Sequence, residues 1–200
     1  MDDIVKQAMA KWPDVPHCYG WLALDARGGW RMRDEQAQQA NLPGDRLHHA
    51  ALLAFINRNY AADARGCWYF QNGPQRVYVN LETTPYIART DPAQGMVVQT
   101  GEALGPVEHA YMTPAGALLV QAGDKLAQVD DRDVAQLLAA MEMDGAPVDD
   151  DALLTWLETG KGSVTLNLGS VRLNVERLSG ADLGQRFGFV AIPQAEESKR

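Results

Sequence analysis

Residues 19–32 read YGWLALDARGGWRM, which is an apolar run, a turn at Asp25–Gly29 and a second, shorter apolar run. Residues 109–120 read HAYMTPAGALLV and repeat this order around a turn at Thr113–Gly116. Two apolar runs on either side of a glycine-containing turn are typical of a β-hairpin. The two stretches lie in different halves of the chain, so they predict a structural unit that occurs twice.

The first half continues with a helix and a second hairpin. Asp45 precedes a strongly apolar segment that reaches Tyr60, and we expect a helix there with Asp45 as its N-cap. Asn72-Gly73 joins residues 67–71 to residues 75–82, and this dipeptide is a strong hairpin-turn signal. The first half therefore predicts a β-hairpin/helix/β-hairpin unit.

The second half repeats this order with a clearer pattern. Asp130 or Asp131 is the predicted N-cap of one helix, and Asp149–Asp151 lies at the start of another, where acidic groups stabilise the helix dipole. Residues 164–176 alternate apolar and polar side chains on both sides of Gly169-Ser170, as expected for a hairpin with one buried face. We expect an α+β fold in which two repeated β-hairpin/helix/β-hairpin units pack into one compact body.

This pattern predicts the division of the chain. We expect residues 1–92 to form an N-terminal helix and the first unit, because the clear elements of the first copy end there. Residues 93–106 are rich in Pro and Gly and predict a connection. Residues 107–193 form the second unit, and residues 194–200 form a flexible terminal tail.

Charge is distributed unevenly between the halves. The net charge is −8, with ten acidic and ten basic residues in positions 1–100 but sixteen acidic and eight basic residues in positions 101–200. Binding to nucleic acid or to an anionic membrane needs clustered Lys and Arg. The charge pattern therefore argues against nucleic acid and membrane as partners, and it is compatible with a protein partner.

The cellular compartment follows from three further observations. No stretch approaches the roughly 20 apolar residues that cross a bilayer. The N-terminus Met1-Asp2-Asp3-Ile4 is acidic and unlike a secretory signal. Two cysteines, Cys18 and Cys67, make no disulfide framework, and we expect both to be free thiols in the cytoplasm.

The first half resembles a known bacterial family. The resemblance lies in Gly29-Trp30 after the turn, the apolar helix, the strands at residues 68–70 and 77–82, and the ending Pro85-Tyr86-Ile87-Ala88. It is similar in these features to the proteobacterial domain of unknown function number 1285, or to a sister family. The resemblance implies two similar β-rich motifs in one chain and a ligand-responsive or signalling role. It carries no catalytic residues.

Aromatic and Arg side chains gather in the first half and suggest a binding surface. Eleven of the fifteen aromatic residues precede position 100, and several stand next to arginines on predicted strands. Aromatic rings give large contact areas, and the Arg guanidinium binds carboxylate or phosphate with a planar fork. We therefore predict that a small anionic ligand or a protein segment binds here. The predicted binding residues are Trp21, Trp30, Arg31, Arg33, Tyr69, Arg76 and Tyr78.

No pattern in the chain indicates a metal site or a cofactor. His48 and His49 are adjacent, so their side chains diverge by about 100° on a helix and cannot easily share one ion. We therefore expect a non-enzymatic ligand-binding or signalling-accessory protein that needs no metal or cofactor. Two alternatives stay open. One is a hydrolase-like enzyme that uses Cys18 with His17 or His48, and the other is a structural protein that self-associates as a homodimer.

Overall fold

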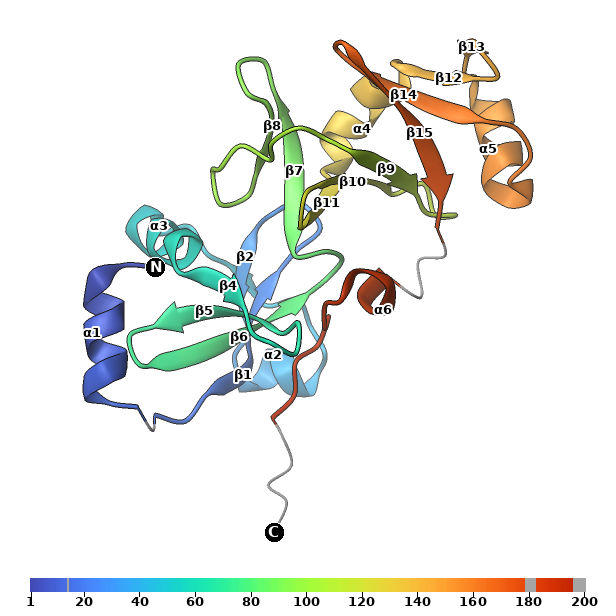
Figure 1. Cartoon of the computed structure of the whole chain (residues 1–200). Coiled ribbons are helices and arrows are strands. Elements are labelled where there is room, and N and C mark those ends of the chain that lie inside the picture. Colours follow the sequence, from blue (N-terminus) through green and yellow to red (C-terminus); the bar gives the residue numbers. More distant parts are fainter. Residues whose placement is uncertain (14, 179–182, 196–200) are drawn as a thin grey trace. The chain divides into compact units, whose positions relative to one another are not determined.

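A computed structural model describes residues 1–13, 15–178 and 183–195 (Figure 1). The chain folds into two compact units, one formed by Met1–Pro85 with the chain from Gly184 onward, and the other by Tyr86–Leu183. Each unit combines a β-sheet with helices, so the predicted α+β class with two units is confirmed.

The first unit is built on a six-stranded sheet. Its strands lie in the order β3-β2-β1-β6-β5-β4, and neighbours are antiparallel except for the central pair β1 and β6, which is parallel. The helix α3 packs against β5 (Figure 1). The elements are α1 (Asp3–Lys11), β1 (Cys18–Leu24), β2 (Trp30–Met32), α2 (Glu35–Gln39), β3 (Asp45–Arg46), α3 (Ala50–Arg58), β4 (Tyr60–Ala62), β5 (Trp68–Asn72), β6 (Gln75–Leu81) and α6 (Leu183–Phe187).

The second unit is built on a nine-stranded sheet. Its strand order is β13-β12-β14-β15-β9-β10-β11-β7-β8, with parallel pairs at β15–β9 and β11–β7. One continuous apolar cluster joins this sheet to both helices of the unit, including Leu137 of α4 and Trp156 of α5. The elements are β7 (Tyr86–Asp91), β8 (Gly95–Val98), β9 (His109–Met112), β10 (Leu118–Ala122), β11 (Lys125–Val129), α4 (Asp131–Leu138), β12 (Met141–Met143), β13 (Ala146–Pro147), α5 (Asp150–Thr159), β14 (Val164–Leu168) and β15 (Val171–Arg177).

The two sheets share one topology, which confirms the predicted repeat. The order β3-β2-β1-β6-β5-β4 recurs as β11-β10-β9-β15-β14-β12, with a parallel pair at the centre of both. Matching hydrogen bonds close the first hairpin of each copy, from Asp25 N to Gly29 O and from Thr113 N to Ala117 O, both at 2.9 Å. The second copy adds β7 and β8 next to β11, β13 next to β12, and α5 before β14.

The helix α3 begins later than its sequence suggests. Asp45 is part of β3 and pairs with β2, so its backbone is committed to the sheet and it cannot cap the helix. Instead, His49 Nδ1 accepts the N–H of Leu52 at 3.2 Å and is the N-cap. The predicted acidic caps are confirmed in the second unit, where Asp130 caps α4 and Asp149 caps α5.

The boundaries between the units differ from the sequence-based division. The hairpin of β7 and β8 covers residues 86–98, which that division assigned partly to the first unit and partly to the connection at 93–106. In the structure β7 pairs with β11, so the hairpin belongs to the second sheet. Of the expected tail, residues 196–200 lie outside the described residues.

A segment near the C-terminus completes the first unit. Val190 N donates to Gly66 O at 2.9 Å, and Ala191 O accepts the N–H of Leu81 at 2.8 Å. Phe189 is only 7 % exposed. Residues 187–192 fall within the range 107–193 predicted for the second unit, but the segment hydrogen-bonds to the first unit and buries Phe189 there.

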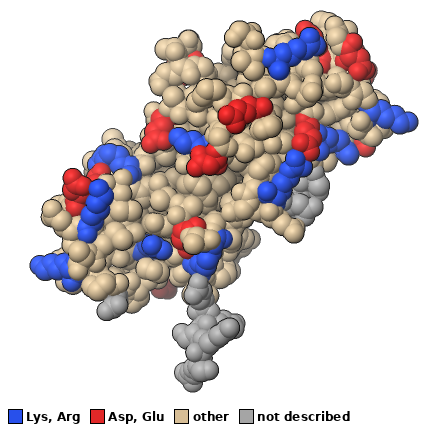
Figure 2. Space-filling view, viewed as in Figure 1, with Lys and Arg blue, Asp and Glu red and all other residues tan. Residues whose placement is uncertain are grey.

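The surface carries mixed charges. On the face shown in Figure 2, acidic and basic side chains are interspersed without a single-sign patch. Among the described residues, no helix is long and apolar enough to cross a bilayer.

Candidate functional site

Three of the predicted binding residues meet on one face of the first sheet. Arg76 lies over the ring of Tyr69 at 4.5 Å, and the rings of Tyr69 and Tyr78 meet edge to face at 5.8 Å. Tyr19, which is not among the predicted binding residues, stacks on Tyr78 with ring centroids 4.5 Å apart. We call this side the tyrosine face. Its register follows from the β5–β6 hairpin, which pairs Tyr69 directly with Tyr78.

The two predicted tryptophans are not on the tyrosine face. Trp21 is 40 % exposed and lies at a pocket on the opposite, α3-covered side of the sheet. Trp30 is buried at 3 % exposure, where its Nε1 donates to Asn57 Oδ1 at 2.8 Å and its ring meets Tyr60 edge to face. Trp30 is therefore a core residue that contacts its own protein.

Arg31 and Arg33 hold loops of the first unit in place. Arg31 Nε donates to Asp25 Oδ2 at 2.8 Å, and its Nη1 donates to Gly44 O at 3.1 Å. Arg33 is 8 % exposed and donates from Nε to Leu42 O at 2.9 Å. Arg31 thus joins the β1–β2 turn to the loop after α2, and Arg33 holds that same loop.

A pocket of about 290 Å³ opens on the tyrosine face. The start of β1, the turn between β4 and β5, and the strand β6 each contribute to its wall. The lining residues are His17, Tyr19, Asp63, Arg65, Arg76 and Tyr78. Two of the seven predicted residues thus line it, and a third, Tyr69, supports Arg76 from below.

One side of the pocket is a closed network around Asp63. Its Oδ1 accepts the N–H groups of Arg65 at 2.9 Å and Cys67 at 3.0 Å. Its Oδ2 accepts Arg65 Nη2 at 3.0 Å and the Tyr78 hydroxyl at 2.9 Å. Burial opposes ionisation, but the hydrogen bonds from Cys67, Tyr78 and Arg65 outweigh it and hold the pKa of this carboxyl below its usual value. Asp63 is therefore ionised and fully engaged by its neighbours.

Arg76 supplies the unbalanced charge of the pocket. Among the described residues, no acidic side chain forms an ion pair with it. Burial lowers the pKa of Arg76, but its hydrogen bond with Tyr78 and the nearby Tyr69 raise that pKa by more than burial lowers it. Arg76 is therefore always charged. The pKa of the His17 imidazole is lowered by burial and then by the charges of Arg76 and Arg65. The same positive potential that discourages a proton on His17 favours an anion in the pocket.

Cys18 and His17, the adjacent pair considered for a Cys–His site, line different pockets. His17 lines the pocket on the tyrosine face, whereas Cys18 lines the pocket on the other face. Adjacent strand residues point to opposite faces, as the sequence predicts. Within the described residues, no group of three or more His, Cys, Asp or Glu side chains is placed to hold a metal ion.

Comparison with known families covers nearly the whole chain. The family DUF2944, described as "Protein of unknown function (DUF2946)", matches residues 1–194. The chain belongs to this family.

A solved structure is also similar to this DUF2944 protein. It is the crystal structure of a DUF1285 family protein from Silicibacter pomeroyi DSS-3, with 13 % sequence identity and a TM-score of 0.48. The match covers 85 % of this chain and 86 % of that chain. The predicted resemblance to family 1285 or a sister family is thereby confirmed. No curated protein gives a significant match to the chain.

Four of the six lining residues are absent from the set predicted from the sequence. Tyr19 belongs to β1 and His17 directly precedes it; β1 pairs with β6 in parallel, and parallel pairing of strands far apart in the chain leaves no local signal. Asp63 and Arg65 lie in the turn Asp63-Ala64-Arg65-Gly66, where an Asp followed by a glycine three residues later is a readable turn pattern. That pattern identifies the turn but not the ring that the turn faces.

Proposed function

We propose that this DUF2944 protein is a non-enzymatic, ligand-responsive protein of the bacterial cytoplasm that binds a small anion in the pocket on its tyrosine face. The supporting observation is that Arg76 is held over Tyr69 at 4.5 Å without a carboxylate partner in the described residues. A guanidinium fixed on an aromatic ring keeps its hydrogen-bonding edge available and loses little entropy on binding.

The repeat provides an internal comparison for Arg76. The β5–β6 hairpin pairs Gln71 with Arg76, and the β14–β15 hairpin pairs Asn167 with Arg172 at the same position relative to the turn. Arg172 Nη2 donates to Glu142 Oε2 at 2.7 Å, so its charge is neutralised within the second unit. Of these two equivalent arginines, only Arg76 offers an uncompensated charge to a ligand.

The size of the pocket limits the ligand. At the ~30 Å³ that one water occupies in the liquid, 290 Å³ holds roughly ten non-hydrogen atoms. This is enough for one phosphate or carboxylate group with a short carbon skeleton. Tyr19, which is partly exposed, presents its ring to such a skeleton, and Arg76 with Arg65 faces the charged end.

Calorimetric titration with inorganic phosphate and with small carboxylates tests the proposal. We expect binding to the wild-type protein and at least a tenfold loss of affinity in Arg76→Gln, because one charge-assisted contact is worth about 1.5–3 kcal/mol. Arg172→Gln is the matched control and retains wild-type affinity. An equal loss in both variants, or no binding of any of these anions at millimolar concentration, contradicts the proposal.

The pH dependence gives a second readout at the same site. The His17 pKa lies below its usual value of 6.5 in the free protein, and a bound anion raises it. Affinity for a small carboxylate, which stays ionised in this range, therefore increases as the pH falls through the His17 pKa of the complex towards the lower His17 pKa of the free protein. His17→Gln removes this increase but leaves binding at pH 8 nearly unchanged. A steep pH dependence that persists in His17→Gln would show that another group titrates.

A further inference from the structure

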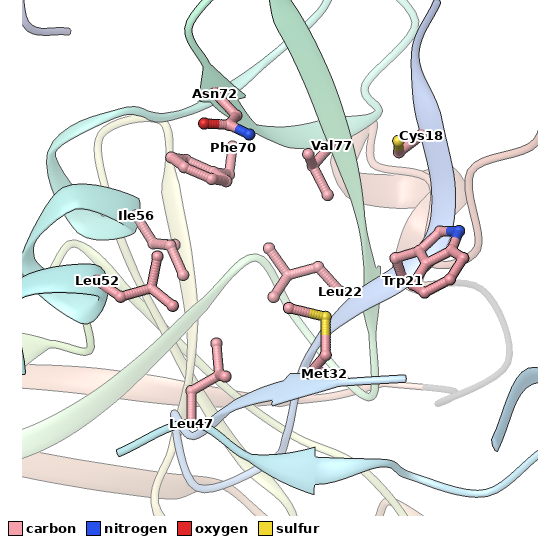
Figure 3. Close-up of a pocket in the computed structure, with 10 residues that line it drawn as sticks. All are labelled: Cys18, Trp21, Leu22, Met32, Leu47, Leu52, Ile56, Phe70, Asn72 and Val77. Carbon is pink, nitrogen blue, oxygen red and sulfur yellow. The ribbon is translucent and has the colours of Figure 1, made fainter. Parts of the chain in front are cut away.

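A second pocket lies on the opposite face of the first sheet, between the strands and α3 (Figure 3). Its volume is about 280 Å³. In Figure 3, side chains from α3, from the loop before it and from four strands surround one open space. The lining residues are Cys18, Trp21, Leu22, Met32, Leu47, Leu52, Ile56, Phe70, Asn72 and Val77.

The lining of this pocket is apolar and uncharged, in contrast to the charged lining of the anion pocket. No lining side chain is charged, and the polar groups are the thiol of Cys18, the amide of Asn72 and the indole N–H of Trp21. Leu22 and Ile56 are each 2 % exposed and form a rigid apolar floor, while Trp21 and Met32 stay 40 % and 42 % exposed. Charged ligands lose their hydration here without compensation, whereas each apolar Å² covered contributes about 25 cal/mol.

The repeat places a second hollow at the same position of the fold. In both copies the helix ends on matching hydrogen bonds, Asn59 N to Ile56 O at 3.1 Å and Ala140 N to Leu137 O at 3.0 Å. Ile56 lines the pocket in the first unit, and Leu137 lines a pocket of about 740 Å³ in the second.

The hairpins that close the two pockets also correspond. The β5–β6 turn runs from Asn72 to Gln75, and the β14–β15 turn runs from Leu168 to Val171. Asn72 and Leu168 each line the pocket of their own unit. A hollow between helix and hairpin therefore occurs in both copies, although different side chains line it.

We propose that the pocket between α3 and the first sheet binds an uncharged, apolar small molecule, of the class of a medium-length alkyl chain or a single aromatic ring with one hydrogen-bonding group. At ~30 Å³ per water-sized group, the pocket holds about nine non-hydrogen atoms. The Asn72 amide forms no hydrogen bond with any described residue and lies at the rim, where it receives the polar end of the ligand.

This inference is independent of the proposed anion site. The two pockets lie on opposite faces of one sheet, so each can be removed without the other. Trp21→Ala and Arg76→Gln are accordingly expected to affect different ligands.

Two lining residues report on occupancy. Cys18 is partly exposed in the pocket, whereas Cys67 is buried at 4 % exposure. A maleimide therefore reacts preferentially with Cys18, and peptide mass spectrometry identifies the modified residue. The fluorescence of Trp21 provides the second signal, compared with Trp21→Phe to subtract the other tryptophans.

The probe is 1-octanol, with octylammonium as a charged counterpart of the same number of non-hydrogen atoms. We expect 1-octanol to slow modification of Cys18 at least fivefold and to shift Trp21 fluorescence, and octylammonium to do neither at equal concentration. Equal protection by both compounds, or no protection by 1-octanol at its solubility limit, overturns the proposal. A concentration-dependent dimer that protects Cys18 without 1-octanol also overturns it, because the occupant would then be a second copy of the chain.

Variants separate pocket binding from general hydrophobic binding. Leu52→Asp introduces a carboxylate into the pocket wall and is expected to weaken 1-octanol binding at least tenfold. Leu154→Asp is the control, because Leu154 is 58 % exposed on α5 and lies outside the pocket. Asn72→Leu, at the exposed rim, keeps the fold and removes the preference for 1-octanol over 1-chlorooctane. Unchanged 1-octanol affinity in both Leu52→Asp and Asn72→Leu contradicts the assignment.

Discussion

Replacing Gly66 with alanine tests whether the C-terminal segment is part of the first unit. Gly66 has a φ of +76°, and a Cβ built on it would lie 2.2 Å from the backbone oxygen of Gly188. That distance is far inside van der Waals contact, and neither atom belongs to a flexible side chain. The segment must therefore move away from the β4–β5 turn in Gly66→Ala.

The expected loss of stability has three parts. Left-handed backbone costs a non-glycine residue ~1–2 kcal/mol. Displacement of the segment breaks the hydrogen bond from Val190 N to Gly66 O, which contributes about 1 kcal/mol. Phe189 is 7 % exposed in the wild-type protein, and its partial exposure in the variant costs a further ~1–2 kcal/mol. We expect the free energy of unfolding of the first unit to fall by about 3–5 kcal/mol.

Gly73→Ala is the matched control in the same unit. Gly73 has a φ of +56°, and the nearest atom to its added Cβ is Ala8 Cβ at 3.9 Å, an ordinary contact. This variant loses only the ~1–2 kcal/mol of backbone strain. Urea unfolding followed by tryptophan fluorescence measures both values. In a chain that ends at Leu183, the penalty of Gly66→Ala should fall to that of Gly73→Ala, and equal penalties in the full chain would refute the placement of the segment.

Two further substitutions test structural roles against functional ones. Arg31→Ala leaves the buried Asp25 carboxylate without its partner at 2.8 Å and should cost about 2 kcal/mol in urea unfolding, with phosphate affinity unchanged; a selective loss of phosphate binding would make Arg31 a ligand-binding residue after all. The hydrogen bonds and charge of Arg132 lower the Asp130 pKa from 3.8 to about 2, so this carboxylate stabilises the fold above pH 4 and the contribution disappears as the pH falls through 2. Asp130→Asn should therefore lose about 2 kcal/mol at pH 7 and show a flatter decline in acid, and a pH profile parallel to the wild type would exclude this role.

The repeat was predictable because its signals are local. Glycine turns and alternating side chains mark hairpins wherever they occur, as at the β5–β6 turn, although its central residues are Gly73 and Pro74 and Asn72 pairs with Gln75. The placement of Trp30 was not predictable in the same way. Strand alternation puts Trp30 and Arg31 on opposite faces, but the sequence does not say which face α3 covers.

Long-range contacts explain most of the other differences. The parallel β1–β6 pair brings His17 and Tyr19 to Arg76, and the return of the chain at Gly184 attaches Phe189 to the first unit. Neither contact has a sequence pattern of its own, because both join segments separated by a folded unit or most of one. Clustering of aromatic and Arg residues led to the surface predicted in the first half. Of its three arginines, Arg76 lines the pocket on the tyrosine face, whereas Arg31 and Arg33 donate to groups of their own unit.

An irregularity in β1 determines how one sheet presents two unlike pockets. Cys18 pairs with Val77 and Leu22 pairs with Val79, so four residues of β1 span the same length as two of β6. Gly20, with a φ of +81°, lies within this bulge, and a Cβ there would meet Gln38 Oε1 at 2.6 Å. Because the offset is even, Cys18 and Leu22 stay on the apolar side and Tyr19 stays on the tyrosine face. A bulge with one residue fewer would exchange the faces on one side of it, turning apolar side chains toward the anion pocket. Gly20 therefore lies in the irregular part of β1, between Tyr19, which lines the anion pocket, and Trp21, which lines the apolar pocket.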